Sequence, residues 1–167
     1  MIRPVPNNNE ITFADNQIIV SKTDTKGKIT YGNKTFIEIS GYSEEELLDQ
    51  PHSILRHPDM PKAIFKLLWD AVQSKKEINA YVKNLAKDGS YYWVLANVTT
   101  SLDKNNEIIG YFSVRRKPKK DAVEKVSDIY KKMLKLERTG GMTASLQYLT
   151  NLLEEKGVTY EEFIISL

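Results

Sequence analysis

Residues 51–61 read PHSILRHPDMP and place both histidines of the chain, an arginine and an aspartate between three prolines. His52, Arg56, His57 and Asp59 offer an imidazole pair, a guanidinium and a carboxylate on backbone that the prolines hold rigid. Asp59 could instead only cap the helix that follows, with Arg56 as its ion-pair partner. A metal site is a further alternative, although this spacing matches no common ligand pattern.

The composition limits the chain to one compact domain with an extension. It has 167 residues, of which 41% are hydrophobic, and a net charge of +2 with acids and bases interspersed. This balance does not predict a nucleic-acid or membrane surface, and no apolar stretch approaches a bilayer-spanning length. The absence of cysteine excludes disulfides, zinc-thiolate sites and any thiol nucleophile. We therefore expect a soluble, cytoplasmic protein that does not insert into the membrane.

The elements that must position the proline-rich segment are two strands, several short helices and a three-strand meander. Short apolar runs at 18–21 and 28–31 predict a hairpin, and apolar positions at helical spacing predict a helix over 60–74. Strands are predicted at 80–86, 91–99 and 108–115, the first two joined at an Asp-Gly turn. This order predicts an α+β fold, with a five-stranded antiparallel sheet, helices over one face and a pocket between the two layers.

The chain is predicted to fall into three parts. Residues 1–16 show no sustained period and are expected to form a flexible or loosely docked N-terminal segment. Residues 17–118 form the sheet-containing domain, and residues 119–167 form a C-terminal helical extension. Ala122, Val126, Ile129, Met133 and Leu136 recur at coiled-coil spacing until Gly140 and Gly141 end the first helix. This apolar seam predicts either a homodimer or partner contact, or packing on the chain's own domain.

The sequence resembles PAS domains, and more narrowly the flavin-binding PAS domains of bacterial aerotaxis receptors and stand-alone energy-taxis proteins. Four stretches carry the resemblance: ITYGNKTFIEISGYSEEEL, QPHSILRHPDMPKAIFKLLW, YVKNLAKDGSYYWVLANVT and GYFSVRRKP. It covers about residues 17–118 and implies a PAS fold holding FAD non-covalently as a redox sensor. It does not imply an enzyme.

The resemblance also implies roles for single residues. Arg56, His57 and Asp59 match the motif associated with FAD retention, and His52 sits where light-sensing relatives place their adduct-forming cysteine. Asn84 matches the asparagine that hydrogen-bonds the pyrimidine edge of the flavin, although it could instead satisfy a turn. The candidate cofactor-binding residues are Asn33, His52, Arg56, His57, Asp59, Trp69, Asn84 and Arg115.

Several of these residues have plain structural alternatives. Asn33 could be a helix N-cap and Trp69 a core residue. If its register matches that of the light-sensing relatives, Arg115 would point inward from the last strand, where a buried cation favours a flavin that gains negative charge on reduction. The chain also departs from the resemblance at Ile78 and Leu85, where the family pattern has tryptophan and arginine, so FAD binding could be weaker here.

The function implied is a redox or energy sensor that relays the state of FAD to a membrane-bound, HAMP-containing chemoreceptor. Two alternatives stay open. A haem-binding gas sensor would use His52 or His57 as its axial ligand, and an apo PAS module would serve only as a dimerisation adaptor.

Overall fold

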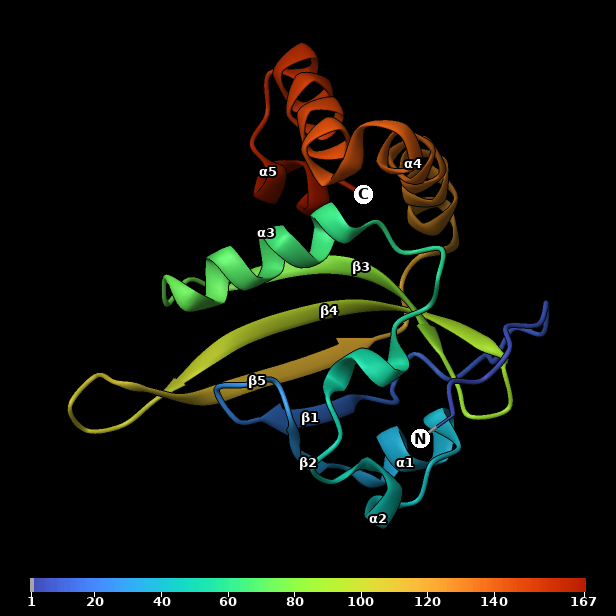
Figure 1. Ribbon diagram of the computed structural model, residues 1–167, viewed down its shortest axis with the longest axis vertical. Coiled ribbons are helices and arrows are strands. Elements are labelled where there is room, and N and C mark those ends of the chain that lie inside the picture. Colours follow the sequence, from blue (N-terminus) through green and yellow to red (C-terminus); the bar gives the residue numbers. More distant parts are fainter. Residues whose placement is uncertain (1) are drawn as a thin grey trace.

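The computed structural model describes residues 2–167 and contains one five-stranded antiparallel sheet in the order β2-β1-β5-β4-β3 (Figure 1). This confirms the predicted α+β fold. The hairpins form at turns with left-handed backbone, including Gly27 between the first two strands and Gly89 between β3 and β4. The strands are β1 (Ile19–Thr23), β2 (Ile29–Gly32), β3 (Ile78–Leu85), β4 (Tyr91–Leu102) and β5 (Ile108–Arg116).

The long central strand β4 divides the molecule into two faces. Its side chains alternate in burial from Tyr91 to Val98, and the buried set is Tyr92, Val94, Ala96 and Val98. Successive residues of a strand point to opposite faces, so this set marks the inner face of the sheet. The inner face forms one wall of the space beneath the short helices.

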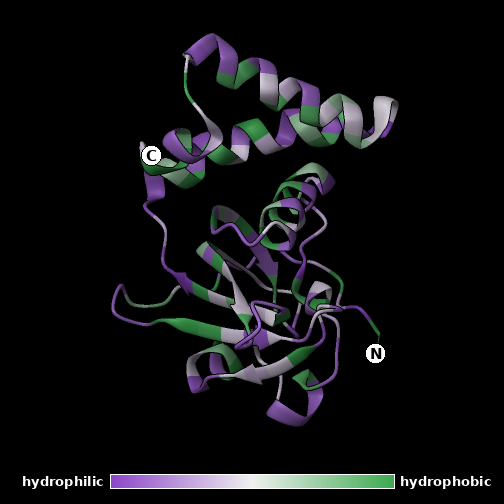
Figure 2. Ribbon diagram, turned by 90° about the vertical axis from the view of Figure 1, so that its left-hand side faces the viewer, coloured by the Kyte–Doolittle hydropathy of each residue, from purple (hydrophilic) through white to green (hydrophobic). Residues whose placement is uncertain are grey.

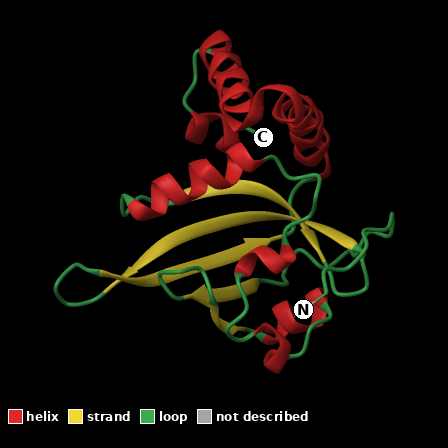
Figure 3. Ribbon diagram, viewed as in Figure 1, coloured by secondary structure: helices red, strands yellow, loops and turns green. Residues whose placement is uncertain are grey.

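Short helices cover the inner face (Figure 3). They are α1 (Lys34–Ser40), α2 (Glu44–Leu47), the 3-10 helix η1 (His52–Leu55) and α3 (Lys62–Gln73). A capping box begins α2, because Ser43 accepts from the Glu46 amide and the Glu46 carboxylate accepts from the Ser43 amide. Gly41, with φ 76°, ends α1 in a left-handed conformation.

The C-terminal extension consists of α4 (Lys120–Lys156) and α5 (Tyr160–Ile165). Gly141 has φ 71° and ψ −171°, so it breaks α4 into two arms at the predicted position. The predicted apolar seam packs on the chain's own domain, with Ala122, Val126 and Met133 buried. Figure 2 shows the two arms lying together above the sheet domain. None of the helices within residues 2–167 is long and apolar enough to cross a bilayer.

The N-terminal segment follows a defined path along the β3–β4 turn. The Asn7 amide donates to the Gly89 carbonyl at 2.8 Å, the Ile11 amide donates to Tyr91, and the Tyr91 amide donates back to Asn9. Phe13 is buried at the end of this path. The flexibility expected of residues 1–16 stays a prediction, but residues 7–11 are docked by backbone hydrogen bonds.

Candidate functional site

A cavity of about 350 Å³ lies between the inner face of the sheet and the layer formed by η1 and α3. Small-molecule and cofactor pockets commonly have volumes of about 300–1,000 Å³. Its walls are mostly apolar and include Phe65 and Leu68 from α3, Val82 from β3, and Ala96 and Val98 from β4. The five predicted site residues that line it are His52, Arg56, Trp69, Asn84 and Arg115.

The charges of the lining are one-sided. Lys26, Arg56 and Arg115 all line the cavity, and none of the described lining residues is Asp or Glu. Burying a charge without a counter-charge costs free energy, and a ligand of opposite charge reduces that cost. The cavity therefore favours an anionic or strongly hydrogen-bond-accepting ligand.

Arg115 is held at the floor of the cavity by neutral partners. It is only 2% exposed, and its Nη2 donates to Ser21 Oγ at 2.6 Å while its Nη1 lies 3.1 Å from His52 Nε2. Burial lowers the pKa of Arg115 to about 10, so the guanidinium remains charged at neutral pH. Its central carbon also lies 4.8 Å from the centre of the Phe36 ring, within cation–π range.

His52 is the acceptor in this group. Its Nε2 lies 3.1 Å from both Ser21 Oγ and Arg115 Nη1. Burial, together with the positive charges of Arg115 and Arg56, lowers the pKa of His52 to about 3. The ring is therefore neutral, and Nε2 carries the lone pair that faces the guanidinium.

Several buried donors of the cavity lack a hydrogen-bond partner among the described residues. They are Asn84 Nδ2, Arg56 Nε and Arg115 Nε. An unpaired buried polar group costs about 1–3 kcal/mol, and native folds rarely leave such groups without a protein, water or ligand partner. The side-chain amide of Asn84, on a residue only 4% exposed, is thus available to a guest.

Arg56 enters the cavity from the segment between η1 and α3. Its guanidinium lies 3.7 Å from the centre of the Phe65 ring, and its backbone forms an isolated antiparallel bridge with Asn84. Burial and the nearby charge of Arg3 lower the pKa of Arg56. The bridge brings together Arg56 and Asn84, which are 28 residues apart in the sequence (84 minus 56).

Trp69 lines the cavity from α3 and meets the Tyr111 ring edge-on, with ring centres 5.2 Å apart. Gly27 lies beneath the same indole, and a Cβ there would come within 3.3 Å of it. The tryptophan thus packs against the sheet and also lines the cavity, while its contact with a cofactor stays a prediction.

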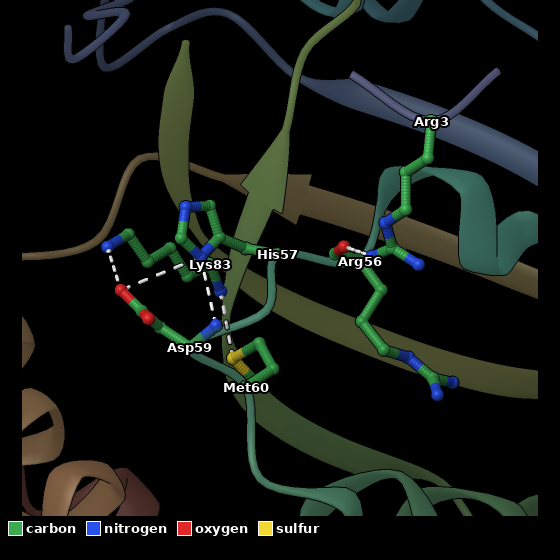
Figure 4. A network of polar contacts seen from close by, with 6 residues as sticks. All are labelled: Arg3, Arg56, His57, Asp59, Met60 and Lys83. Atoms are coloured by element: carbon green, nitrogen blue, oxygen red, sulfur yellow. Dashed lines mark hydrogen bonds and ion pairs between the residues drawn. The ribbon is translucent and has the colours of Figure 1, made fainter. Parts of the chain in front are cut away.

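Three predicted residues do not line the cavity. Asn33 is an N-cap: its Oδ1 accepts from the amides of Phe36 and Val20, and its Nδ2 donates to the Ile18 carbonyl. His57 and Asp59 lie on the other side of their segment, where Lys83 contacts Asp59 (Figure 4). A direct contact of these three residues with a cofactor stays a prediction that the cavity lining does not support.

Sequence reasoning missed several lining residues, of which Ser21 and Lys26 bear most on the charge of the cavity. Ser21 lines the cavity and binds Arg115, and its position two residues after the buried Ile19 on β1 could have revealed it. Lys26 comes from the turn before β2, and no sequence motif marked it as a cavity residue. Ile78 and Leu85, where the chain departs from the family resemblance, are absent from the lining, and Leu85 is fully buried.

A sheet of this order, with short helices enclosing a polar-floored cavity, defines a PAS-type sensor domain. A family model described as "PAS fold" matches residues 29–115, and the chain belongs to this family.

Among curated proteins, the aerotaxis receptor of Escherichia coli strain K12 is 39% identical over 119 residues, which are 71% of this chain and 23% of that protein. The nitrogen fixation regulatory protein of Klebsiella pneumoniae is 29% identical over 99 residues, 59% of this chain and 20% of that protein. The chain thus spans about a quarter or less of the length of these relatives.

Solved structures agree on the fold. A PAS domain from Colwellia psychrerythraea superposes with a TM-score of 0.56 at 25% identity, covering 60% of this chain and 86% of that one. The dark structure of the blue-light photoreceptor Aureochrome1 LOV superposes with a TM-score of 0.59 at 20% identity, covering 71% of this chain and 86% of that one.

Proposed function

We propose that this protein is a redox sensor that holds FAD non-covalently in the cavity between the sheet and α3. The observation that carries the proposal is the combination of apolar walls, a fixed cation at Arg115 and an unpaired amide at Asn84. The similarity to the aerotaxis receptor supports it. Bound FAD would supply reversible electron acceptance, which the side chains of this protein do not provide.

The roles of the cavity residues follow from their chemistry. Asn84 can donate to a carbonyl oxygen and accept from a ring N–H, which suits the pyrimidine edge of a flavin. Arg115 favours negative charge in its neighbourhood, and Arg56 is a donor suited to phosphate oxygens. Without a cysteine, the chain cannot form the thioether adduct of light-sensing relatives.

The signal would leave the cavity through the elements that wall it. A change of charge beside Arg115 would alter its hydrogen bonds to Ser21 and His52, which belong to β1 and η1. We propose that the outer face of the sheet and the C-terminal helices carry this change to a membrane-bound, HAMP-containing chemoreceptor, with the protein acting as a cytoplasmic homodimer. The light-state dimer of the fungal photoreceptor Vivid, which shares the fold, supports the dimer.

The test is an absorbance spectrum of freshly purified protein before and after dithionite. We expect the two bands of a flavin near the blue region, bleached on reduction, and release of FAD on denaturation. A Soret band would overturn the proposal in favour of haem, whose iron would have to displace Arg115 from His52 Nε2. Colourless protein that gains no thermal stability from added FAD would instead favour the adaptor.

A further inference from the structure

Lys83, on the edge strand β3, contacts three residues of the segment between η1 and α3 (Figure 4). Its carbonyl accepts from the His57 amide at 3.3 Å, and its amide donates to Met60 Sδ at 3.2 Å. Its Nζ donates to Asp59 Oδ2 at 2.8 Å. Lys83 thereby holds the segment through both backbone and side-chain hydrogen bonds.

The segment that contains Arg56 and His57 pairs with β3 at Asn84 and Lys83, and we call this pairing the junction. Arg56 and Asn84 form the backbone bridge, and both line the cavity. His57, which follows Arg56, and Lys83, which precedes Asn84, do not line it. In extended backbone, neighbouring side chains point in opposite directions. A contact that fixes His57 and Asp59 against Lys83 therefore also fixes the direction in which Arg56 points.

Further contacts hold Asp59 and Lys83 on the side of the junction that faces away from the cavity. The Asp59 amide donates to His57 Nδ1 at 3.0 Å, and the Lys83 ammonium lies 4.4 Å from the centre of the Tyr91 ring. The Lys83 side chain is only 16% exposed, whereas that of Asp59 is 60% exposed. Burial alone would raise the pKa of Asp59, but the hydrogen bond and charge of Lys83 outweigh it and the pKa is lowered.

We propose that Lys83 is a positioning residue that acts through Asp59 and His57 to hold the Arg56 guanidinium in the cavity. The proposal deepens the proposed function and rests on it. It also accounts for Asp59 and His57, which resemble cofactor-retaining residues yet lie outside the lining. They would affect ligand binding by positioning Arg56 and not by contacting the ligand.

The test is a double-mutant cycle on FAD affinity, measured by titrating FAD into flavin-free protein. We expect Lys83→Met to weaken FAD binding by about tenfold, and by less than about twofold when Arg56→Met is already present. Equal losses in both backgrounds would overturn the proposal, because Lys83 would then act independently of Arg56. Lys83→Arg keeps the ion pair and should restore most of the affinity.

The matched control is Lys66→Met, which removes an exposed ion pair with Asp70 on α3 and should leave FAD affinity unchanged. Hydrogen exchange in flavin-free protein gives a second readout that does not depend on FAD. We expect Lys83→Met to speed exchange of the amides of His57, Asp59 and Met60 by about tenfold relative to the wild type. Unchanged exchange there would overturn the positioning role, whereas a wild type that binds no FAD would overturn only the proposed function.

Discussion

At the scale of single residues, the polar floor of the cavity depends on which group carries a proton. Arg115 keeps its charge, and His52 presents a lone pair to it, so the pair is a cation and a neutral acceptor. Protonating His52 would place two positive charges in contact. The geometry therefore makes the stability of the protein sensitive to mild acid.

We predict the sign and size of this dependence. The pKa of His52 is about 3 in the folded protein and 6.5 ordinarily, so between these values only the unfolded chain binds the proton. Stability should then fall as the pH is lowered, with His52 contributing about 2 kcal/mol of loss between pH 7 and pH 5. Urea unfolding at several pH values checks this, with His52→Gln as the comparison. Parallel pH profiles of the two proteins would contradict it.

The residue scale also shows how far the sequence could define the site. Asn84, Arg115 and His52 line the cavity, and their contact with a cofactor stays a prediction. His57 does not, because adjacent residues of extended backbone point to opposite sides and the sequence does not say whether Arg56 or His57 faces inward. Only the pairing of the segment with β3 decides this, and that pairing joins distant residues. Asp59 does not line the cavity either, since it lies in the turn that follows.

At the scale of elements, α3 has an unusual N-terminus. Its N-cap is Pro61, which makes no side-chain cap hydrogen bond. Instead the Glu137 carboxylate, on α4, accepts from the amides of Lys62 and Ala63 at 3.0 Å each and from the buried Ser145 hydroxyl at 2.7 Å. One carboxylate thus joins the helix that walls the cavity to both arms of α4.

We predict that Glu137→Ala destabilises the protein by about 1–2 kcal/mol, since it removes the cap of α3 and leaves the Ser145 hydroxyl without this acceptor. Glu137→Gln, which keeps one acceptor oxygen, should lose less. Urea unfolding measures both changes. Glu124→Ala, an exposed substitution on the same helix, is the control, and an equal loss in the control would show that helix propensity and not capping is responsible.

The elements themselves were predictable because their signals are local. The capping box at Ser43, the glycine that breaks α4 and the alternation of β4 all lie within a few residues of sequence. The cap at Glu137 was not predictable, because it acts on Lys62, 75 residues away. From sequence alone, a glutamate in an amphipathic helix is expected on the solvent-exposed face.

At the scale of the whole molecule, the C-terminal helices protect the edge of the sheet. The Tyr130 hydroxyl on α4 donates to the Tyr81 carbonyl at 2.6 Å, and the Tyr160 hydroxyl on α5 donates to the Asn79 carbonyl at 3.0 Å. Both acceptors are backbone groups of β3, the strand at the edge. An uncovered edge strand offers such groups to other chains.

We predict that a chain ending at residue 118 folds but self-associates more strongly than the full chain, because the β3 edge and the Trp93 ring that stacks on Tyr130 become exposed. Light scattering coupled to size-exclusion chromatography over a range of concentrations measures this. The full chain carrying Tyr130→Phe, which loses one hydrogen bond but keeps the cover, should associate no more than the wild type. A truncated chain no more associated than the full chain would contradict the prediction.

The excess of cations around the cavity has a consequence for the life of the protein in a cell. A newly synthesised chain must fold with Arg56 and Arg115 facing an interior that lacks any acidic partner among the described lining residues. Whatever fills that interior stabilises only the folded form, so degradation falls on the unfilled molecules. On the proposed function, we therefore expect the steady-state amount of the protein to follow the supply of FAD, so that starvation for its vitamin precursor would lower both the amount of protein and the fraction that holds FAD.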